Sequence, residues 1–170
     1  MATLYIRRGA ATEQVVDIAN KGITCLSAPF LTAADAKPLP SRNWPDEHGD
    51  DIYFPAKMML AAYDEELTLG CMTTESAESL AAARTAIFNF IDWLTGNDTE
   101  NGGGTELAIY SPYTTQGRQH CHFAGIAEED AVLMRVRRGG SETWESYVTF
   151  KVKIHVGDPY TNITLAPAND

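Results

Sequence analysis

One segment of the chain carries a clear helical pattern of apolar positions. Between residues 76 and 95, apolar side chains recur every three or four positions, which places them on one stripe of a helix: Leu80, Ala83, Ile87, Phe90, Ile91 and Leu94. A hydroxyl side chain at position 74 or 76 can cap the start, and Gly96 can end the helix. The one-sided stripe predicts a helix that lies on a surface. Three larger residues fall on its other faces, toward solvent or a neighbour: Phe88, Asp92 and Trp93.

Most of the remaining pattern alternates with a period of two, as in strands that bury one face. The alternation is longest in residues 144–156, where every second residue from Val148 to Val156 is apolar. Residues 57–63 fit a helix or a strand, and we favour a strand because a strand-like run follows directly. Other strands are predicted at residues 3–7 and 14–18, as a hairpin, and at 23–26, 64–73, 105–110, 118–126 and 131–138.

This order of elements predicts the fold class. Many strands interrupted by one helix favour an α+β fold that is mainly antiparallel β, because a parallel sheet would need more crossover helices. We expect a β-sandwich flanked by one amphipathic α-helix. The length suits a single domain that spans residues 1–170.

A long segment, residues 29–55, follows neither period. It contains five prolines, Trp44 and an acid-rich run at residues 46–51. Structureless loops longer than about 12–15 residues are uncommon in compact domains and usually have a binding function. Ordering each loop residue costs about 1–2 kcal/mol, which some contact must offset. We therefore predict an arm that docks on another subunit, with these interface residues: Lys37, Arg42, Asn43, Trp44, Pro45, Asp46, Glu47, His48, Asp50 and Asp51.

Composition and charge narrow the possible functions. The net charge of −10 argues against binding to phosphate backbones, which depends on Lys and Arg. The three cysteines are widely spaced, which argues against a disulfide framework or a zinc finger and favours three small buried side chains. No apolar run approaches 18 residues, so no transmembrane helix is expected. The first residues lack the apolar core of a signal peptide, which favours a protein made and used in a cytoplasm, or in something assembled there.

Three clusters carry candidate chemistry. The acids of residues 46–51 with His48 can bind a metal, although their spacing fits neither an EF-hand loop nor a His-x-Glu zinc site, and a solvated or partner-facing surface explains them better. His120 and His122 share one face of a strand and can clamp a transition metal, but no third ligand lies nearby in the sequence. The arginines at 135, 137 and 138 form either a docking patch for the acidic loop of a neighbouring copy or a solvated face. We therefore expect no metal, no cofactor and no catalytic site.

The layout of the chain resembles a known family. An N-terminal hairpin precedes a long loop with the text NWPDEHGDD, a single helix follows, and then come the strand GTELAIY, Gly117-Arg118 and a final VTFKVKIHVGDPYT strand. This layout, from Leu4 to Thr164, resembles the tail proteins of tailed bacteriophages, especially the distal tail protein and its relatives with the tail-tube fold. The resemblance implies a helix-flanked β-sandwich. It also implies six copies in a ring around a DNA channel, with the long loop reaching an adjacent subunit.

Two functions are consistent with these observations. The first is a structural virion protein without catalytic activity, assembled in the host cytoplasm into a ring within a phage tail, for which the resemblance implies six copies. Its partners would be its own copies and other tail proteins, and DNA would pass through without specific binding. The alternative is a small soluble metal-dependent enzyme or metal-binding domain that uses the acidic loop or the His120/His122 pair.

Overall fold

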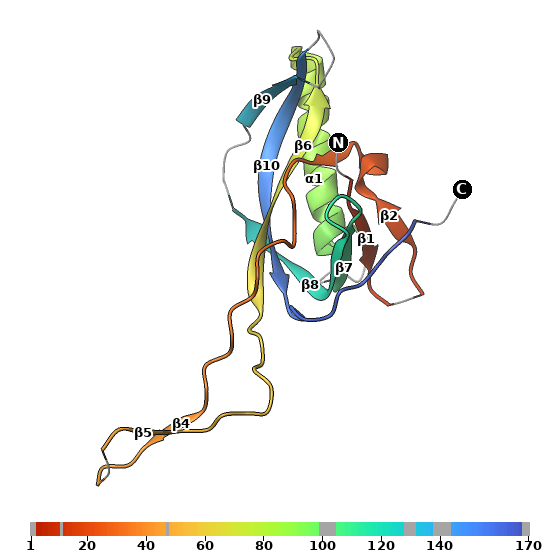
Figure 1. Ribbon diagram of the computed structural model, residues 1–170. Helices are drawn as coiled ribbons and strands as arrows, with labels where there is room; N and C mark the ends of the chain where they lie inside the picture. Colours follow the sequence, from red (N-terminus) through yellow and green to blue (C-terminus); the bar gives the residue numbers. More distant parts are fainter. Residues whose placement is uncertain are drawn as a thin grey trace.

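The computed structural model consists of a curled β-sheet, an α-helix packed against it and an arm that projects from one end (Figure 1). It describes residues 3–10, 12–46, 48–98, 105–127, 132–137 and 144–167. The α+β class with a mainly antiparallel sheet is confirmed. The expected sandwich takes the form of one continuous curled sheet, so its layers are parts of the same sheet.

The sheet is built around its longest strand, β10 (Trp144–Val156). One edge of β10 pairs with β6 (Tyr63–Thr73), and the other edge is shared by β9 (Val132–Arg137) and β8 (Gln116–Ile126). All of these pairings are antiparallel. The remaining strands extend the sheet on both sides in the order β2-β1-β7-β8-β10-β6-β3: β1 (Tyr5–Arg8), β2 (Val15–Asp17), β3 (Ile23–Cys25) and β7 (Leu107–Ser111).

The strand predictions are confirmed with one exception. The N-terminal hairpin forms as β1 and β2, and residues 64–73 and 144–156 form the two long strands. Residues 57–62 do not form the strand that we favoured, since only an isolated bridge joins Ala36 to Leu60. These residues belong to the arm, where no neighbouring sheet edge is available to pair with them. The turn expected after residue 138 lies outside the described residues.

The helix α1 (Ala77–Thr95) forms as the apolar stripe predicts. The Ser76 side chain accepts a hydrogen bond from the Ser79 N–H at 3.2 Å, and Gly96 ends the helix in the left-handed conformation. Most of the stripe is buried, whereas Leu80 lies at its exposed margin and Ile91 is half-buried. In the part of the chain that the structure describes, no helix combines the length and apolar character that crossing a membrane requires.

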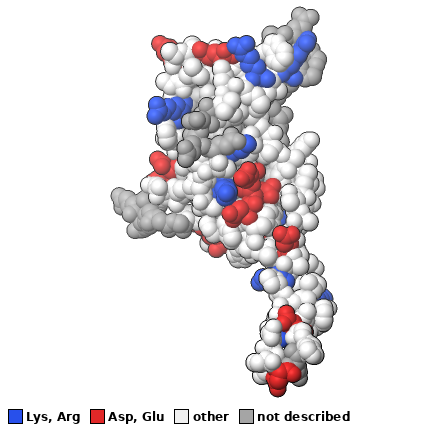
Figure 2. All heavy atoms as spheres, turned by 90° about the vertical axis from the view of Figure 1, so that its left-hand side faces the viewer, with Lys and Arg blue, Asp and Glu red and all other residues white. Residues whose placement is uncertain are grey.

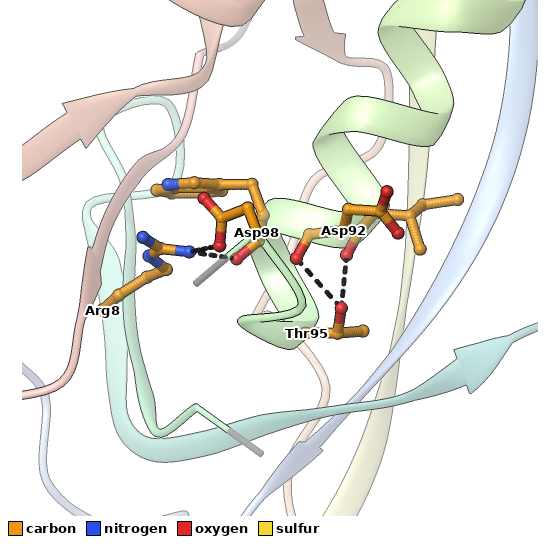
Figure 3. Close-up of polar contacts among 6 residues, drawn as sticks. Arg8, Asp92, Thr95 and Asp98 are labelled. Atoms are coloured by element: carbon orange, nitrogen blue, oxygen red, sulfur yellow. Dashed lines mark hydrogen bonds and ion pairs between the residues drawn. The ribbon is translucent and has the colours of Figure 1, made fainter. Parts of the chain in front are cut away.

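Trp93 was predicted to lie outside the core, and that prediction is wrong. Its indole is buried and contacts two cations, the Arg8 guanidinium at 5.0 Å and the Lys21 ammonium at 4.6 Å from the ring centroid. Arg8 also donates to the Trp93 carbonyl at 2.8 Å and pairs with Asp98 (Figure 3). A cation at the helix C-terminus is favourable because the last carbonyls carry partial negative charge. Arg8 therefore joins β1 to the end of α1.

A second ion pair joins β9 to the start of α1. The Arg135 guanidinium donates two hydrogen bonds to the Glu75 carboxylate, at 2.8 and 2.7 Å, and the Ser146 hydroxyl donates a third. The hydrogen bonds from Arg135 and then Ser146 lower the pKa of Glu75 to about 2. This contact holds the projecting end of the β9–β10 hairpin against the loop before the helix.

We expect this contact to weaken in acid. Because the folded-state pKa of Glu75 lies below its usual value of 4.5, the contact stabilises the fold above pH 4.5 and loses its contribution as the pH falls toward about 2. Glu75→Gln should therefore lower the melting temperature at neutral pH. The difference in melting temperature between this variant and the parent should shrink as the pH approaches 2. Glu78→Gln, which removes the next acid in the first turn of α1, is the control. A difference between parent and Glu75→Gln that stays constant with pH would contradict this assignment.

Candidate subunit-interface arm

The arm, residues 31–62, leaves the body at the end of the sheet where β6 begins (Figure 1). Backbone hydrogen bonds connect its outgoing and returning segments at three places, from Lys37 to Met59, from Ala61 to Asp35 and from Tyr53 to Pro40, at 2.7 to 2.9 Å. Toward the tip, β4 (Ser41–Asn43) pairs with β5 (Asp50–Ile52). The arm is therefore a narrow two-stranded ribbon rather than a loop folded onto its own domain.

The base of the arm is fixed to the body by a buried polar contact. The Glu65 carboxylate, on β6, accepts a hydrogen bond from the Phe30 N–H at 2.9 Å. Phe30 is buried with φ at +63°, a conformation that is rare for a residue with a side chain, and the Arg118 guanidinium lies 5.8 Å from its ring centroid. Burial raises the pKa of Glu65. These contacts set the point at which the chain leaves the body.

Beyond its base, the arm exposes large apolar side chains. Seven of them are between 42% and 72% exposed: Leu31, Trp44, Ile52, Tyr53, Phe54, Met58 and Met59. A two-stranded ribbon has only marginal stability in water, because it cannot bury enough apolar surface to offset the entropy of ordering. Contiguous exposed apolar surface on a protein usually marks a site of interaction. The exposed apolar side chains of the arm are typical of a surface that another molecule covers.

Charged residues gather near the tip. Figure 2 shows acidic side chains at the end of the arm. Asp46 lies in the turn between the two strands, and Asp50 and Asp51 lie in β5. The guanidinium of Arg42, a residue of β4, stands 6.0 Å from the centroid of the Trp44 ring, which follows the same strand. The tip therefore combines an aromatic ring with a local excess of carboxylates.

The structure brings the predicted interface residues together on this ribbon. Lys37 lies near the base, Arg42 and Asn43 lie in β4, and Asp50 and Asp51 lie in β5. The turn between these strands holds Trp44, Pro45, Asp46 and His48, and all nine of these residues are exposed. The tenth predicted residue, Glu47, lies outside the described residues.

Sequence reasoning missed the apolar half of the arm. Ile52, Tyr53 and Phe54 are consecutive exposed residues in the returning segment, and Met58 and Met59 were assigned to a strand of the sheet. An available signal was the absence of alternation in the text IYFPAKMML, since a half-buried strand would place polar residues between the apolar ones. These five residues enlarge the candidate interface.

The histidine pair does not form a shared ligand set with a third residue. His120 Nδ1 lies 2.8 Å from Glu106 Oε1, while the His122 ring packs on His155 with centroids 4.8 Å apart. Both His120 and His122 border a cavity of about 520 Å³. Among the residues that the structure places, no three His, Cys, Asp or Glu side chains gather as metal ligands.

Cys121, which lies between these histidines, is unsuited to be a nucleophile. Its side chain is buried, and burial raises the pKa of its thiol to about 12. Because the thiolate is the reactive form, a thiol with this pKa stays protonated and inert near neutral pH. Cys25 and Cys71 are also buried, as the sequence predicted, and all three thiols are free.

Comparisons with known proteins add no relative. No protein-family model and no curated protein sequence matches this chain.

Proposed function

We propose that this chain is a structural protein that assembles with copies of itself through its arm. One observation carries the proposal: a narrow ribbon with seven exposed large apolar residues projects from a body that has its own buried core. Covering these side chains would remove apolar surface from water at about 25 cal/mol per Å². The exposed side chains of the arm are suited to binding another molecule rather than to catalysing a reaction, which favours a structural role over a catalytic one.

The form of the assembly follows from the shape of the subunit. An arm that docks on the body of the next copy, without that copy's arm docking back, makes a heterologous interface. Such interfaces close into rings when the rotation between copies permits it. The similarity in layout to phage tail proteins favours a closed ring, with six copies as the expected number.

The proposed location is the tail of a virion or a related injection machine, assembled in the host cytoplasm. In this role the ring surrounds a channel, contacts other tail proteins and lets DNA pass. The net charge of −10 supports a wall to which DNA does not adhere, since adhesion depends on Lys and Arg that displace counterions.

The mass of the purified protein in solution tests this proposal. We expect light scattering after gel filtration to give a multiple of the 18.6 kDa chain mass. The mass should fall on dilution if the interface is weak, because association depends on concentration. A mass of one chain at every concentration up to the solubility limit would overturn the proposal.

Duplex DNA is expected to bind poorly even at low ionic strength. A carboxylate-rich wall repels the phosphates, and salt weakens this repulsion over a Debye length of about 10 Å at 0.1 M. Gel-shift titration of the assembled protein should show a dissociation constant weaker than about 10⁻⁴ M. Sub-micromolar binding that fades as salt rises would contradict the prediction and would point to the arginines of β9.

A further inference from the structure

The strand β9 has an open edge with unusual composition. It pairs with β10 on one side, and no strand in the described ranges pairs with its other side. Three consecutive residues on it, Val132, Leu133 and Met134, are exposed. By contrast, Ile23 and Cys25 of the edge strand β3 are buried. Exposed apolar edge strands readily pair with another chain, so natural proteins usually cover them.

The same strand carries positive charge. Arg135 and Arg137 are its only ionisable residues, and the Arg135 side chain is 63% exposed even while it bonds to Glu75. Like charges oppose pairing of β9 with itself, whereas an acidic strand is electrostatically favoured. The arm strand β5 carries Asp50 and Asp51, followed by the exposed Ile52. In apolar character and in charge, β5 and β9 are complementary.

The position of β9 prevents it from meeting the arm of its own chain. β9 pairs with residues Trp144–Thr149 of β10, whereas the arm leaves beside Val156, at the other end of the same strand. Figure 1 shows the two at opposite ends of the molecule, and Figure 2 shows Lys and Arg side chains at the end away from the arm. An arm that reaches β9 must therefore come from another copy.

We propose that β9 is the acceptor for the β4–β5 ribbon of a second copy. The ribbon adds to the open edge of β9, so its backbone groups complete hydrogen bonds that water otherwise satisfies. Ile52 and Trp44 then cover the apolar stretch that includes Leu133, and Asp50, which shares a face of β5 with Ile52, lies near the arginines that share the face of Leu133. This inference rests on the proposed self-assembly and names the surface that receives the arm.

Cross-linking between two variants tests the contact. Protein with Ile52→Cys is mixed with protein with Leu133→Cys, dissociated by dilution, reassembled and oxidised. The native thiols are buried, so they contribute little background. Docking raises the effective concentration of the two thiols, and we expect about tenfold or more disulfide-linked dimer than in a control mixture of Ile52→Cys with Phe88→Cys. Phe88 is a residue of α1 that is 53% exposed, against 44% for Leu133.

A charge variant gives a second, independent readout. Leu133→Asp places a carboxylate in the proposed acceptor, facing the acidic ribbon, and should raise the concentration at which the assembly dissociates about tenfold. Phe88→Asp is the control and should leave that concentration unchanged. An assembled parent protein whose cross-linking equals the control, and whose assembly tolerates Leu133→Asp, would overturn β9 as the acceptor while the proposed function stands. A parent protein that is monomeric throughout would overturn both.

Discussion

Trp44→Ala is expected to convert the assembled protein largely to monomer. The indole is the largest side chain near the tip of the arm, is 46% exposed in the single chain and is flanked by the Arg42 guanidinium. A buried aromatic anchor at an interface contributes about 2 kcal/mol or more, which corresponds to a roughly 30-fold weaker association for each interface lost. The body should be unaffected, because Trp44 contributes nothing to its core.

Sedimentation velocity of the parent and the variant at matched concentrations measures this effect. Tyr113→Ala is the matched control, because it removes an aromatic ring that is 71% exposed on the body, in the turn between β7 and β8. The control should keep the parent's distribution of species. An unchanged distribution for Trp44→Ala would mean that the arm does not hold the copies together by its tip.

Phe90→Ala is expected to have the largest effect on the stability of the body. Phe90 is buried at the centre of the helix–sheet contact, with its ring 6.0 Å from Trp93 and 6.4 Å from Phe150, centroid to centroid. Removing a buried phenylalanine ring costs about 3–5 kcal/mol, from lost transfer free energy and from the cavity left behind. For a chain of this length that cost lowers the melting temperature by about 6–20 °C.

The comparison is best made in the Trp44→Ala background, so that dissociation does not contribute to the transition. Phe88→Ala is the control two positions earlier, because Phe88 is 53% exposed and contacts the Arg84 guanidinium rather than the core. Phe88→Ala should change the free energy of unfolding by no more than about 0.5 kcal/mol. If the two variants had the same melting temperature, the helix face assigned to the core would be incorrect.

The features that were predicted from the sequence are those set by local periodicity. The stripe of α1 and the alternation of β10 each repeat over several turns or pleats, so a few deviating residues do not hide them. The arm was detectable for the opposite reason, because prolines and acids interrupt both periods over residues 29–55. Its extent was underestimated, since Met58 and Met59 have strand-like composition but lie in the returning segment.

The features that were missed depend on contacts between distant segments. Trp93 lies in the core because Arg8 and Lys21, more than seventy positions away, cover its ring. The pattern of an apolar stripe includes only apolar residues three or four positions apart along the helix, so it does not reveal contacts with Arg8 and Lys21. The contacts of His120 and His122 were missed for a similar reason, because they depend on how β8 pairs with β7. Leu107 pairs with Cys121 and Ile109 pairs with Arg118, so β8 has one extra residue, a bulge, between these two pairs. His120 takes φ +54° there and contacts Glu106, while the His122 ring packs on His155.

Electron micrographs of the purified protein test the central claim most directly. The proposed ring, held together by the arm, predicts closed particles with a central opening in negative stain, and their subunit number follows from the rotational symmetry of the class averages. The Trp44→Ala protein, imaged at the same concentration, should show separate particles. Elongated single particles in both samples, each with a free arm, would contradict the account, because the exposed apolar ribbon would then persist without a partner copy.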